Sequence, residues 1–195
     1  MKAFFQVLAA LGVAVTCFSV GFSLQPSPEL KLNCKDCESC ESYKKLQREL
    51  KTFKNKNRKP SNIAIKATTK ASTVHSTSSQ YNSANVNDED LSTEWAAYGL
   101  ENQWIKLEWN SPYYIKSIKL FDRINSVDQV LKAKISFSDG TDISCEALPN
   151  GGVEPNFIKV EKESIDSLII NLSKVKGLNA GLTEVEVYGW SDDNH

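Results

Sequence analysis

The chain has 195 residues, 41% hydrophobic and 24% charged, which is enough for one ordinary folded domain with appendages and too balanced for wholesale disorder. Its net charge of −1 argues against a nucleic-acid binder that works through bulk positive charge. Its only histidines are His75 and the terminal His195, which nearly excludes a multi-histidine metal site or a catalytic triad.

The charge is unevenly distributed along the chain. Residues 29–60 hold ten Lys and Arg against five Asp and Glu, a net charge of +5. Residues 61–195 hold twelve and nineteen, a net charge of −7. A basic segment therefore precedes an acidic domain, and the two are interpreted separately.

The N-terminal residues predict a secretory signal peptide over 1–23. Lys2 is followed by an almost uninterrupted apolar run, Ala3 to Phe22, with small residues near its end. The run is long enough to span a bilayer, so an uncleaved anchor at the cell surface is the alternative. Either way the chain would be secreted or extracellular, and the glycosylation sequon that begins at Asn171 (Asn-Leu-Ser) fits that route.

A cysteine cluster opens the next segment, a stalk predicted over residues 24–60. Cys34, Cys37 and Cys40 form Cys-x-x-Cys-x-x-Cys in a polar stretch. A zinc site would need a fourth ligand and a reducing compartment. Cys145, on one face of a predicted strand, is expected to be a buried free thiol. Three stalk cysteines are an odd number, so at least one pairs with another chain or stays free.

An amphipathic helix is predicted directly after the cluster. Tyr43, Leu46, Leu50 and Phe53 are spaced 3, 4 and 3 residues apart, the a/d rhythm of a coiled coil. Two heptads are marginal alone, but disulfides at one end would raise the effective concentration of the partner helix. The sequence thus predicts a homo-oligomer linked through the stalk. The alternative is a lone helix that packs on its own domain.

Residues 61–190 are predicted to form an all-β domain, followed by a short tail over 191–195. Runs rich in Val, Ile, Thr and aromatic residues predict strands at 63–69, 104–109, 113–121, 130–137, 141–146, 157–161, 167–173 and 183–189. This many short strands in roughly 130 residues indicate an antiparallel β-sandwich or jelly roll.

Four segments of this domain carry a family resemblance. They are Asn85–Trp95 (NVNDEDLSTEW), Gln103–Leu107, Pro112–Asp122 and Gly181–Gly189. In this order they resemble discoidin-type domains, also called coagulation-factor C-type or galactose-binding-like domains, a group that includes bacterial galactose-binding carbohydrate modules. The resemblance implies a galactose-binding-like β-sandwich that binds sugar. One departure is Glu89, which stands where the family prefers glycine.

The loop at residues 85–95 offers hard oxygen donors. Asp88, Asp90, Ser92 and Thr93 lie within six residues, and oxygens in a flexible loop suit Ca²⁺, which takes six to eight of them. The resemblance implies that Asp88, Asp90 and Thr93 hold the ion together with Glu184 from the last strand. The alternative is an acidic turn capped by hydroxyl groups, without a metal.

A polar loop between two predicted strands is the candidate ligand site. It presents a guanidinium, carboxylates and amides, which are the groups that recognise sugar hydroxyls. The candidate side chains are Arg123, Asn125, Asp128 and Gln129, joined by Tyr98 and Asn102 from a loop that the family's topology places nearby. The alternative is a solvated loop in which Arg123 pairs with Asp122 or Asp128.

Together these patterns predict a secreted, calcium-containing, carbohydrate-binding module whose partner is a glycan or glycoprotein. The chain shows none of the common hydrolase, metalloprotease or phosphate-binding motifs, so we expect no enzyme activity and no nucleic-acid partner. The alternative is an adhesion or matrix module that binds protein or lipid. Mostly polar loops and an acidic domain disfavour membrane insertion.

Overall fold

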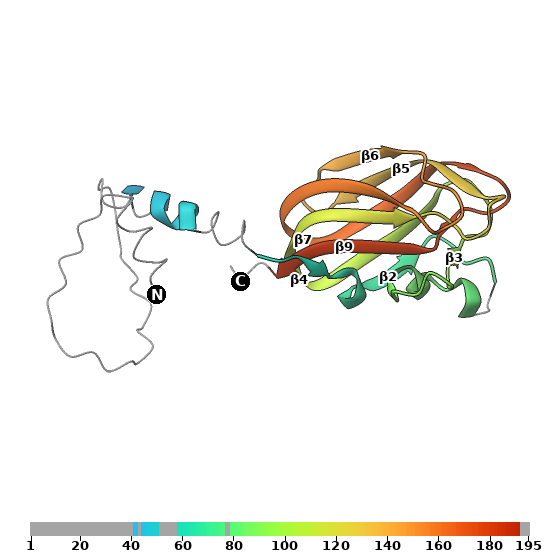
Figure 1. Cartoon of the computed structure of the whole chain (residues 1–195), viewed down its shortest axis with the longest axis horizontal. Coiled ribbons are helices and arrows are strands. Elements are labelled where there is room, and N and C mark those ends of the chain that lie inside the picture. The colour runs from blue at the N-terminus through green and yellow to red at the C-terminus, as the bar shows by residue number, and fades with distance from the viewer. Residues whose placement is uncertain (1–40, 43, 51–57, 77–78, 192–195) are drawn as a thin grey trace, which may run out of the picture. The chain divides into compact units, whose positions relative to one another are not determined.

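The computed structural model (Figure 1) describes residues 41–42, 44–50, 58–76 and 79–191. The chain divides into two compact units, residues 1–56 and 57–195. Some sequence predictions lie outside the described residues: the signal peptide, the stalk cysteines Cys34, Cys37 and Cys40, and residues 192–195 of the tail.

The first unit is helical over residues 41–42 and 44–50. Lys44 and Glu41 form an exposed ion pair at 3.6 Å, one turn apart. The helix predicted for the stalk is confirmed over these residues, while its pairing into a coiled coil stays a prediction. Within the described ranges, no helix has the length and apolarity that crossing a membrane would require.

The second unit is an antiparallel β-sandwich, as the sequence predicts. The described strands are β1 (Ser61–Asn62), β2 (Thr68–Ala71), β3 (Trp95–Ala96), β4 (Gln103–Phe121), β5 (Gln129–Phe137), β6 (Asp142–Glu146), β7 (Pro155–Lys176), β8 (Gly181–Leu182) and β9 (Glu184–Ser191). Short 3₁₀ helices stand between the first strands: η1 (Ala64–Lys66), η2 (Ser79–Tyr81) and η3 (Ser83–Asn87).

Two long strands, β4 and β7, run through both layers of the sandwich. In one layer, residues 103–108 of β4 pair with 167–172 of β7, and β2, β5 and β6 complete the sheet. In the other, residues 113–121 of β4 pair with the first half of β7 and with β9, which β1 borders. The sequence predicted two separate strands in each place. That was wrong, because bulges bend each strand at a corner without ending it.

The predicted strand at 63–69 was wrong except at its end, since residues 68 and 69 belong to β2. Residues 64–66 form η1 instead, and the side chain of Asn62 accepts a hydrogen bond from the backbone N–H of Ala64 at 3.1 Å. This local bond turns the chain between β1 and β2. The two-residue strands β3 and β8 were not predicted, because two residues cannot show an alternating pattern.

The core lies between the two layers and includes two fully enclosed tryptophans. The indole N–H of Trp95 donates to the carbonyl of Thr73 at 2.9 Å, and that of Trp109 donates to the carbonyl of Ile63 at 2.8 Å. Both polar groups are therefore satisfied. Cys145 is a buried free thiol, as expected, and burial raises its pKa.

Because β4 and β7 each bend at a corner, both ends of both strands lie at one end of the sandwich. We call this the loop end, formed by the loops at 97–102, 122–128, 147–154 and 177–180. Figure 1 shows the start of β1 and the end of β9 at the opposite end. The loop end is therefore the part of the domain farthest from its two chain ends.

Candidate functional site

The loops at the loop end are tied to one another by hydrogen bonds. The amide of Asn150 donates to the carbonyl of Ser126 at 2.9 Å, which joins the loops 147–154 and 122–128. The backbone N–H of Gly99 donates to the side chain of Asn179 at 3.3 Å. Hydrogen bonds therefore connect the loops, which together form one surface.

An ion-pair cluster of Glu94, Arg123 and Asp128 lies beneath this surface, and we call it the Arg123 cluster. Arg123 is only 5% exposed. Its Nε and Nη2 donate to the two oxygens of Glu94 at 3.2 and 2.5 Å, and its Nη1 donates to Asp128 at 2.5 Å. One buried guanidinium therefore neutralises one carboxylate bidentately and contacts a second.

Asp128 has a second task, which is to hold the loop that follows β7. Its other oxygen accepts hydrogen bonds from the backbone N–H groups of Leu178 at 2.6 Å and Asn179 at 3.3 Å. Gly177 has a φ of +114°, and a Cβ there would lie 2.1 Å from that oxygen. Only glycine fits beside this carboxylate, so Asp128 fixes the loop at close range.

The other predicted residues of the 122–128 region bond within the protein. Asn125 accepts from the backbone N–H of Val127 at 3.0 Å and donates to Asp128 at 3.3 Å. Gln129 donates to the carbonyl of Leu148 at 3.0 Å. The structure has the pairing of Arg123 with Asp128 that the sequence left open, and direct contact of these side chains with a ligand stays a prediction.

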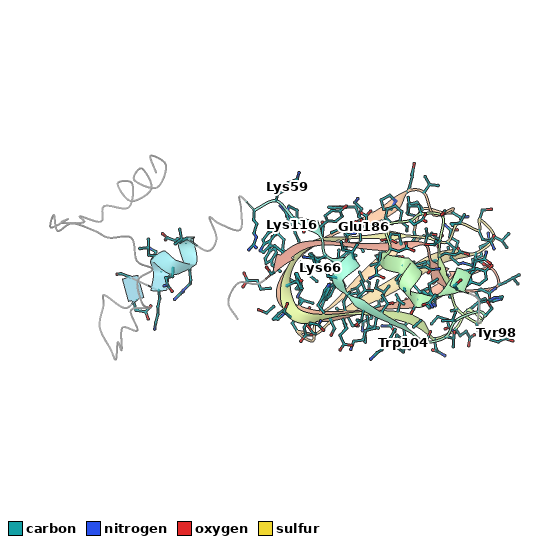
Figure 2. All side chains as sticks on the ribbon, turned by 90° about the horizontal axis from the view of Figure 1, so that it is seen from below. Lys59, Lys66, Tyr98, Trp104, Lys116 and Glu186 are labelled. Carbon is teal, nitrogen blue, oxygen red and sulfur yellow. The ribbon has the colours of Figure 1, made fainter. Side chains whose placement is uncertain are left out.

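Tyr98 is the most prominent aromatic residue of the loop end. Its side chain is 73% exposed, and Figure 2 shows it projecting from the end of the domain. Its backbone is fixed, because its N–H donates to the hydroxyl oxygen of Thr73 at 2.9 Å and its carbonyl accepts from the side-chain amide of Gln103 at 3.2 Å. Asn102, in the same loop, is exposed with a φ of +58°, which asparagine tolerates.

Apolar side chains also point outward from the loop end. Each of the remaining loops exposes at least one: Ile124, Val127, Val153 and Leu178. From the sequence these loops were described as mostly polar, which holds for their composition but not for the side chains that project. A contiguous apolar patch is typical of an interaction surface, and these four side chains are the residues at the loop end that could contribute to one.

The acidic loop after η3 is organised by its own side chains. The hydroxyl of Thr93 donates to Asp88 at 2.8 Å, and the hydroxyl of Ser92 donates to Asp90 at 2.6 Å. The bonds from Ser92 lower the pKa of Asp90. These contacts agree with the capped acidic turn that the sequence offered as the alternative, and they also hold the oxygens in a fixed arrangement.

Glu184 is the unusual carboxylate near this loop. It is 1% exposed, and among the described residues neither of its oxygens has a partner of normal hydrogen-bond geometry, with a weak contact from the backbone N–H of Glu89. Burial, and then the negative charge of Asp88, raise its pKa to about 8. A buried carboxylate without partners calls for an explanation, and a bound cation would supply one.

A calcium ion at this loop would need about six to eight oxygen ligands. Among the residues that the structure describes, no three His, Cys, Asp or Glu side chains are grouped so as to hold a metal. A calcium site would therefore rely on backbone carbonyls and a hydroxyl as well as carboxylates, which is common for this ion. Glu184 interacts electrostatically with Asp88, and Asp88 bonds to the hydroxyl of Thr93, so these three residues offer oxygen donors of the required kind.

Glu89 occupies the position where glycine was expected. Its φ is +63°, so the backbone adopts the left-handed conformation that glycine would provide. This conformation costs roughly 1–2 kcal/mol for a residue with a side chain. The carboxylate of Glu89 accepts a hydrogen bond from Asn62 at 3.1 Å, which ties the acidic loop to β1. The backbone at position 89 thus has a glycine-like conformation although the residue carries a side chain.

Comparison with known proteins places the domain. A family model described as a domain of unknown function, DUF7402, matches residues 62–188. The chain belongs to this family. A search of curated proteins found no match.

Solved structures similar to this DUF7402 domain include several binding modules. An F5/8 type C domain from Bacteroides fragilis has a TM-score of 0.57 at 13% identity, over 68% of this chain and 97% of that one. Chitosan-binding module 2 of a Paenibacillus chitosanase/glucanase, solved with chitotriose, has a TM-score of 0.54 at 20% identity, over 66% of this chain and 100% of that one. A fucolectin from striped bass (Morone saxatilis) serum has a TM-score of 0.56 at 16% identity, over 68% of this chain.

The chain spans about half (49%) of the fucolectin's length. These likenesses confirm the discoidin-type, galactose-binding-like fold that the sequence predicts. They concern the fold alone.

Proposed function

We propose that the chain is a secreted, non-enzymatic module that binds carbohydrate at its loop end, contains one structural Ca²⁺ and is displayed as an oligomer through its stalk. The observation that carries the proposal is Tyr98, an exposed ring on a fixed backbone at the loop end. Support also comes from the fold, because similar structures include a fucolectin and a chitosan-binding module.

The sugar would contact the Tyr98 ring with its apolar C–H face. Asn102 in the same loop and Asn125 in the loop 122–128 are exposed residues whose amides would supply polar contacts to hydroxyl groups. Arg123 and Asp128 act mainly as positioning residues, because most of their hydrogen-bonding groups already hold the loops together. An aromatic platform with a few polar groups on a supported surface is typical of a sugar site.

At the loop end, binding is favoured over catalysis by the state of the two carboxylates in the Arg123 cluster. A general acid or base must exchange its proton readily. Glu94 and Asp128 instead form short ion pairs with Arg123. Such pairs hold geometry rather than transfer protons.

Calcium would be held by Asp88, Asp90, Thr93 and Glu184 together with loop carbonyls. The support is the unpartnered carboxylate of Glu184, which belongs to β9, beside a loop that precedes β3. A bound ion would join these two segments, which are distant in the sequence. Its role would be structural, since it would fix the acidic loop to β9.

Secretion and oligomerisation rest on the sequence. The apolar N-terminal run supports export, and the Cys34, Cys37 and Cys40 cluster before a helix supports a disulfide-linked oligomer. Several copies would raise the apparent affinity for a dense glycan surface, because each further binding event becomes intramolecular.

A second candidate function is an adhesion module that docks on protein or lipid. The exposed apolar side chains of the loop end favour it: Ile124, Val127, Val153 and Leu178. They would bury their surface against a partner rather than against a sugar.

A glycan array probed with the full-length secreted protein tests the proposal. We expect wild type to bind at least one class of glycan, and Tyr98→Ala to abolish binding while leaving the melting temperature nearly unchanged. Phe157→Ala is the matched control, because Phe157 is 63% exposed but lies on the outer face of β7. Equal binding by the two variants would contradict the site. Loss of vesicle or protein binding in Val153→Ala/Leu178→Ala, with no glycan bound by wild type, would favour the second candidate.

A further inference from the structure

The sequon residue Asn171 lies in the second half of β7, within a sheet rather than in a loop. In the register of the sheet, Trp104 of β4 is its neighbour on one side and Lys134 of β5 on the other. All three side chains belong to the outer face, because Ile105, Leu172 and the other alternating residues are buried. Asn171 therefore faces away from the core.

The Asn171 side chain is available for modification. It is half-buried, and in the part of the chain that the structure describes its amide takes part in no hydrogen bond. The sequon hydroxyl of Ser173 donates to the carbonyl of Lys132 at 3.2 Å, across the strand pair. A group attached to the Asn171 amide would extend over the open sheet face without breaking a contact of the fold.

Trp104 differs from the other three tryptophans, because it is neither fully buried nor stacked on another aromatic ring in the described residues. Trp95 and Trp109 are buried with bonded indole N–H groups, and Trp190 stacks on Tyr114 at 4.5 Å and 7°. Trp104 is half-buried on the outer face, and its indole N–H bonds to no other residue that the structure describes. Figure 2 shows its position on this side of the domain.

We propose that Asn171 carries an N-linked glycan whose first N-acetylglucosamine packs on the indole of Trp104. Directly paired residues have Cβ atoms about 4.5–5.5 Å apart, so a sugar on one reaches the ring of the other. The sugar ring has an apolar face of C–H groups, and covering it with an aromatic ring removes both surfaces from water. This inference goes beyond the proposed sugar-binding site and uses only the secretion that the proposed function includes.

The attachment is a group transfer from a lipid-diphosphate-linked oligosaccharide. The amide nitrogen of Asn171 forms a bond to the anomeric carbon of the first N-acetylglucosamine. The bond from that carbon to the phosphate oxygen breaks, the lipid diphosphate leaves with the electron pair, and the amide gives up one proton. Nothing is oxidised or reduced.

Attachment is tested by expressing the full chain with its own N-terminal segment in eukaryotic cells and measuring intact mass. We expect one glycan on wild type and none on Asn171→Gln. Asp139→Asn is the positive control, because it turns the exposed Asp139-Gly140-Thr141 hairpin into a second sequon. A glycan on the Asp139→Asn hairpin but not on Asn171 overturns the site. If neither wild type nor Asp139→Asn carries a glycan, the secretion on which this proposal rests is overturned. The proposed sugar-binding site is tested separately, by the glycan array.

Packing on Trp104 is tested with a glycoform trimmed enzymatically to a single N-acetylglucosamine. We expect this form to melt about 3 °C above Asn171→Gln, since a contact of about 1 kcal/mol shifts a domain of this size by a few degrees. In a Trp104→Ala background the difference should vanish. Lys134→Ala, which removes the neighbour on the opposite side, is the matched control and should keep it. A difference that survives Trp104→Ala overturns the packing.

Discussion

Replacing Arg123 by methionine should destabilise the domain severely. Methionine keeps much of the apolar volume but removes the guanidinium, and two carboxylates then lose their partner. The side chains of Glu94 and Asp128 are only 11% and 2% exposed, so water cannot replace the lost bonds. Breaking a buried pair in this way costs about 3–5 kcal/mol. In a domain of this size, the melting temperature should fall by roughly 10–15 °C.

The reasoning predicts that the damage comes from the unpaired carboxylates and not from the loss of Arg123 itself. The triple variant Arg123→Met/Glu94→Gln/Asp128→Asn removes all three charges and keeps a carbonyl oxygen at position 128 for the backbone of Leu178. It should recover at least half of the lost stability, because a buried ion pair contributes little over neutral groups of similar shape.

Thermal melts and urea titrations of the single and triple variants measure these effects. Lys106→Met is the matched control: Lys106 pairs with Glu108 at 2.9 Å, but on a partly exposed surface. That pair should be worth less than about 1 kcal/mol. A melt for Arg123→Met no lower than that of Lys106→Met would refute the reasoning. Glycan binding by the folded triple variant would show that Arg123 positions the loops without touching the sugar.

Three further predictions follow from the buried and clustered groups. Calcium should raise the melting temperature of wild type but not of Glu184→Gln, with EDTA reversing the rise, since a ligand that binds the folded state stabilises it; equal calcium shifts in both proteins would contradict the metal site. Burial raises the pKa of Asp122 to about 6, so its ionisation destabilises the fold increasingly from about pH 4 to pH 6. Asp122→Asn should therefore be more stable than wild type by up to about 3 kcal/mol at pH 7, but not at pH 3. Melting temperatures of the two proteins that change in parallel between pH 3 and pH 7 would contradict this prediction. On non-reducing gels the secreted chain should migrate as a dimer or larger species. Replacing Cys34, Cys37 and Cys40 together by serine should leave only monomer. A wild-type chain that migrates as a monomer would contradict the disulfide-linked oligomer.

Much of the fold could be predicted because strands show an alternation of apolar and polar residues that is visible within a short segment of sequence. Ile105, Leu107 and Trp109 alternate with polar residues and are all buried, as the period of a strand requires. The turn at Asp139-Gly140-Thr141 was also readable: Gly140 has a φ of +81°, and Thr141 bonds to Asp139. In both cases the residues that determine the local structure lie within a few positions of one another, so the structure can be predicted from a short segment.

The composition of the ion-pair cluster could not be predicted in the same way. Glu94 meets Arg123 across 29 residues, and nothing beside Glu94 in the sequence distinguishes it from other acidic residues. The sequence offered Asp122 or Asp128 as partners of Arg123 because they are near in the chain. Glu94 reaches Arg123 because the loop before β3 folds against the loop after β4, a contact that the sequence does not show.

The bends in the long strands escaped prediction for a related reason. At Asn110-Ser111-Pro112 the alternation breaks, which looks the same whether a strand ends or turns a corner. The structure decides for a corner, because Tyr113 resumes pairing with the same neighbouring strand, β7. A break in sequence pattern therefore locates a corner but does not distinguish it from a chain reversal.

The separation of the loop end from the chain ends has a mechanical consequence. A load between a partner held at the loop end and the chain that enters at Ser61 acts along the strands. Backbone hydrogen bonds of antiparallel sheets run perpendicular to the strands, so such a load strains many of them together instead of one after another. The pairs Ser61–Gly189 and Asn62–Tyr188, with the bond from Ile63 to Val187, would share this force. The domain is thus oriented to resist shear when it is anchored at one end and attached to a surface at the other.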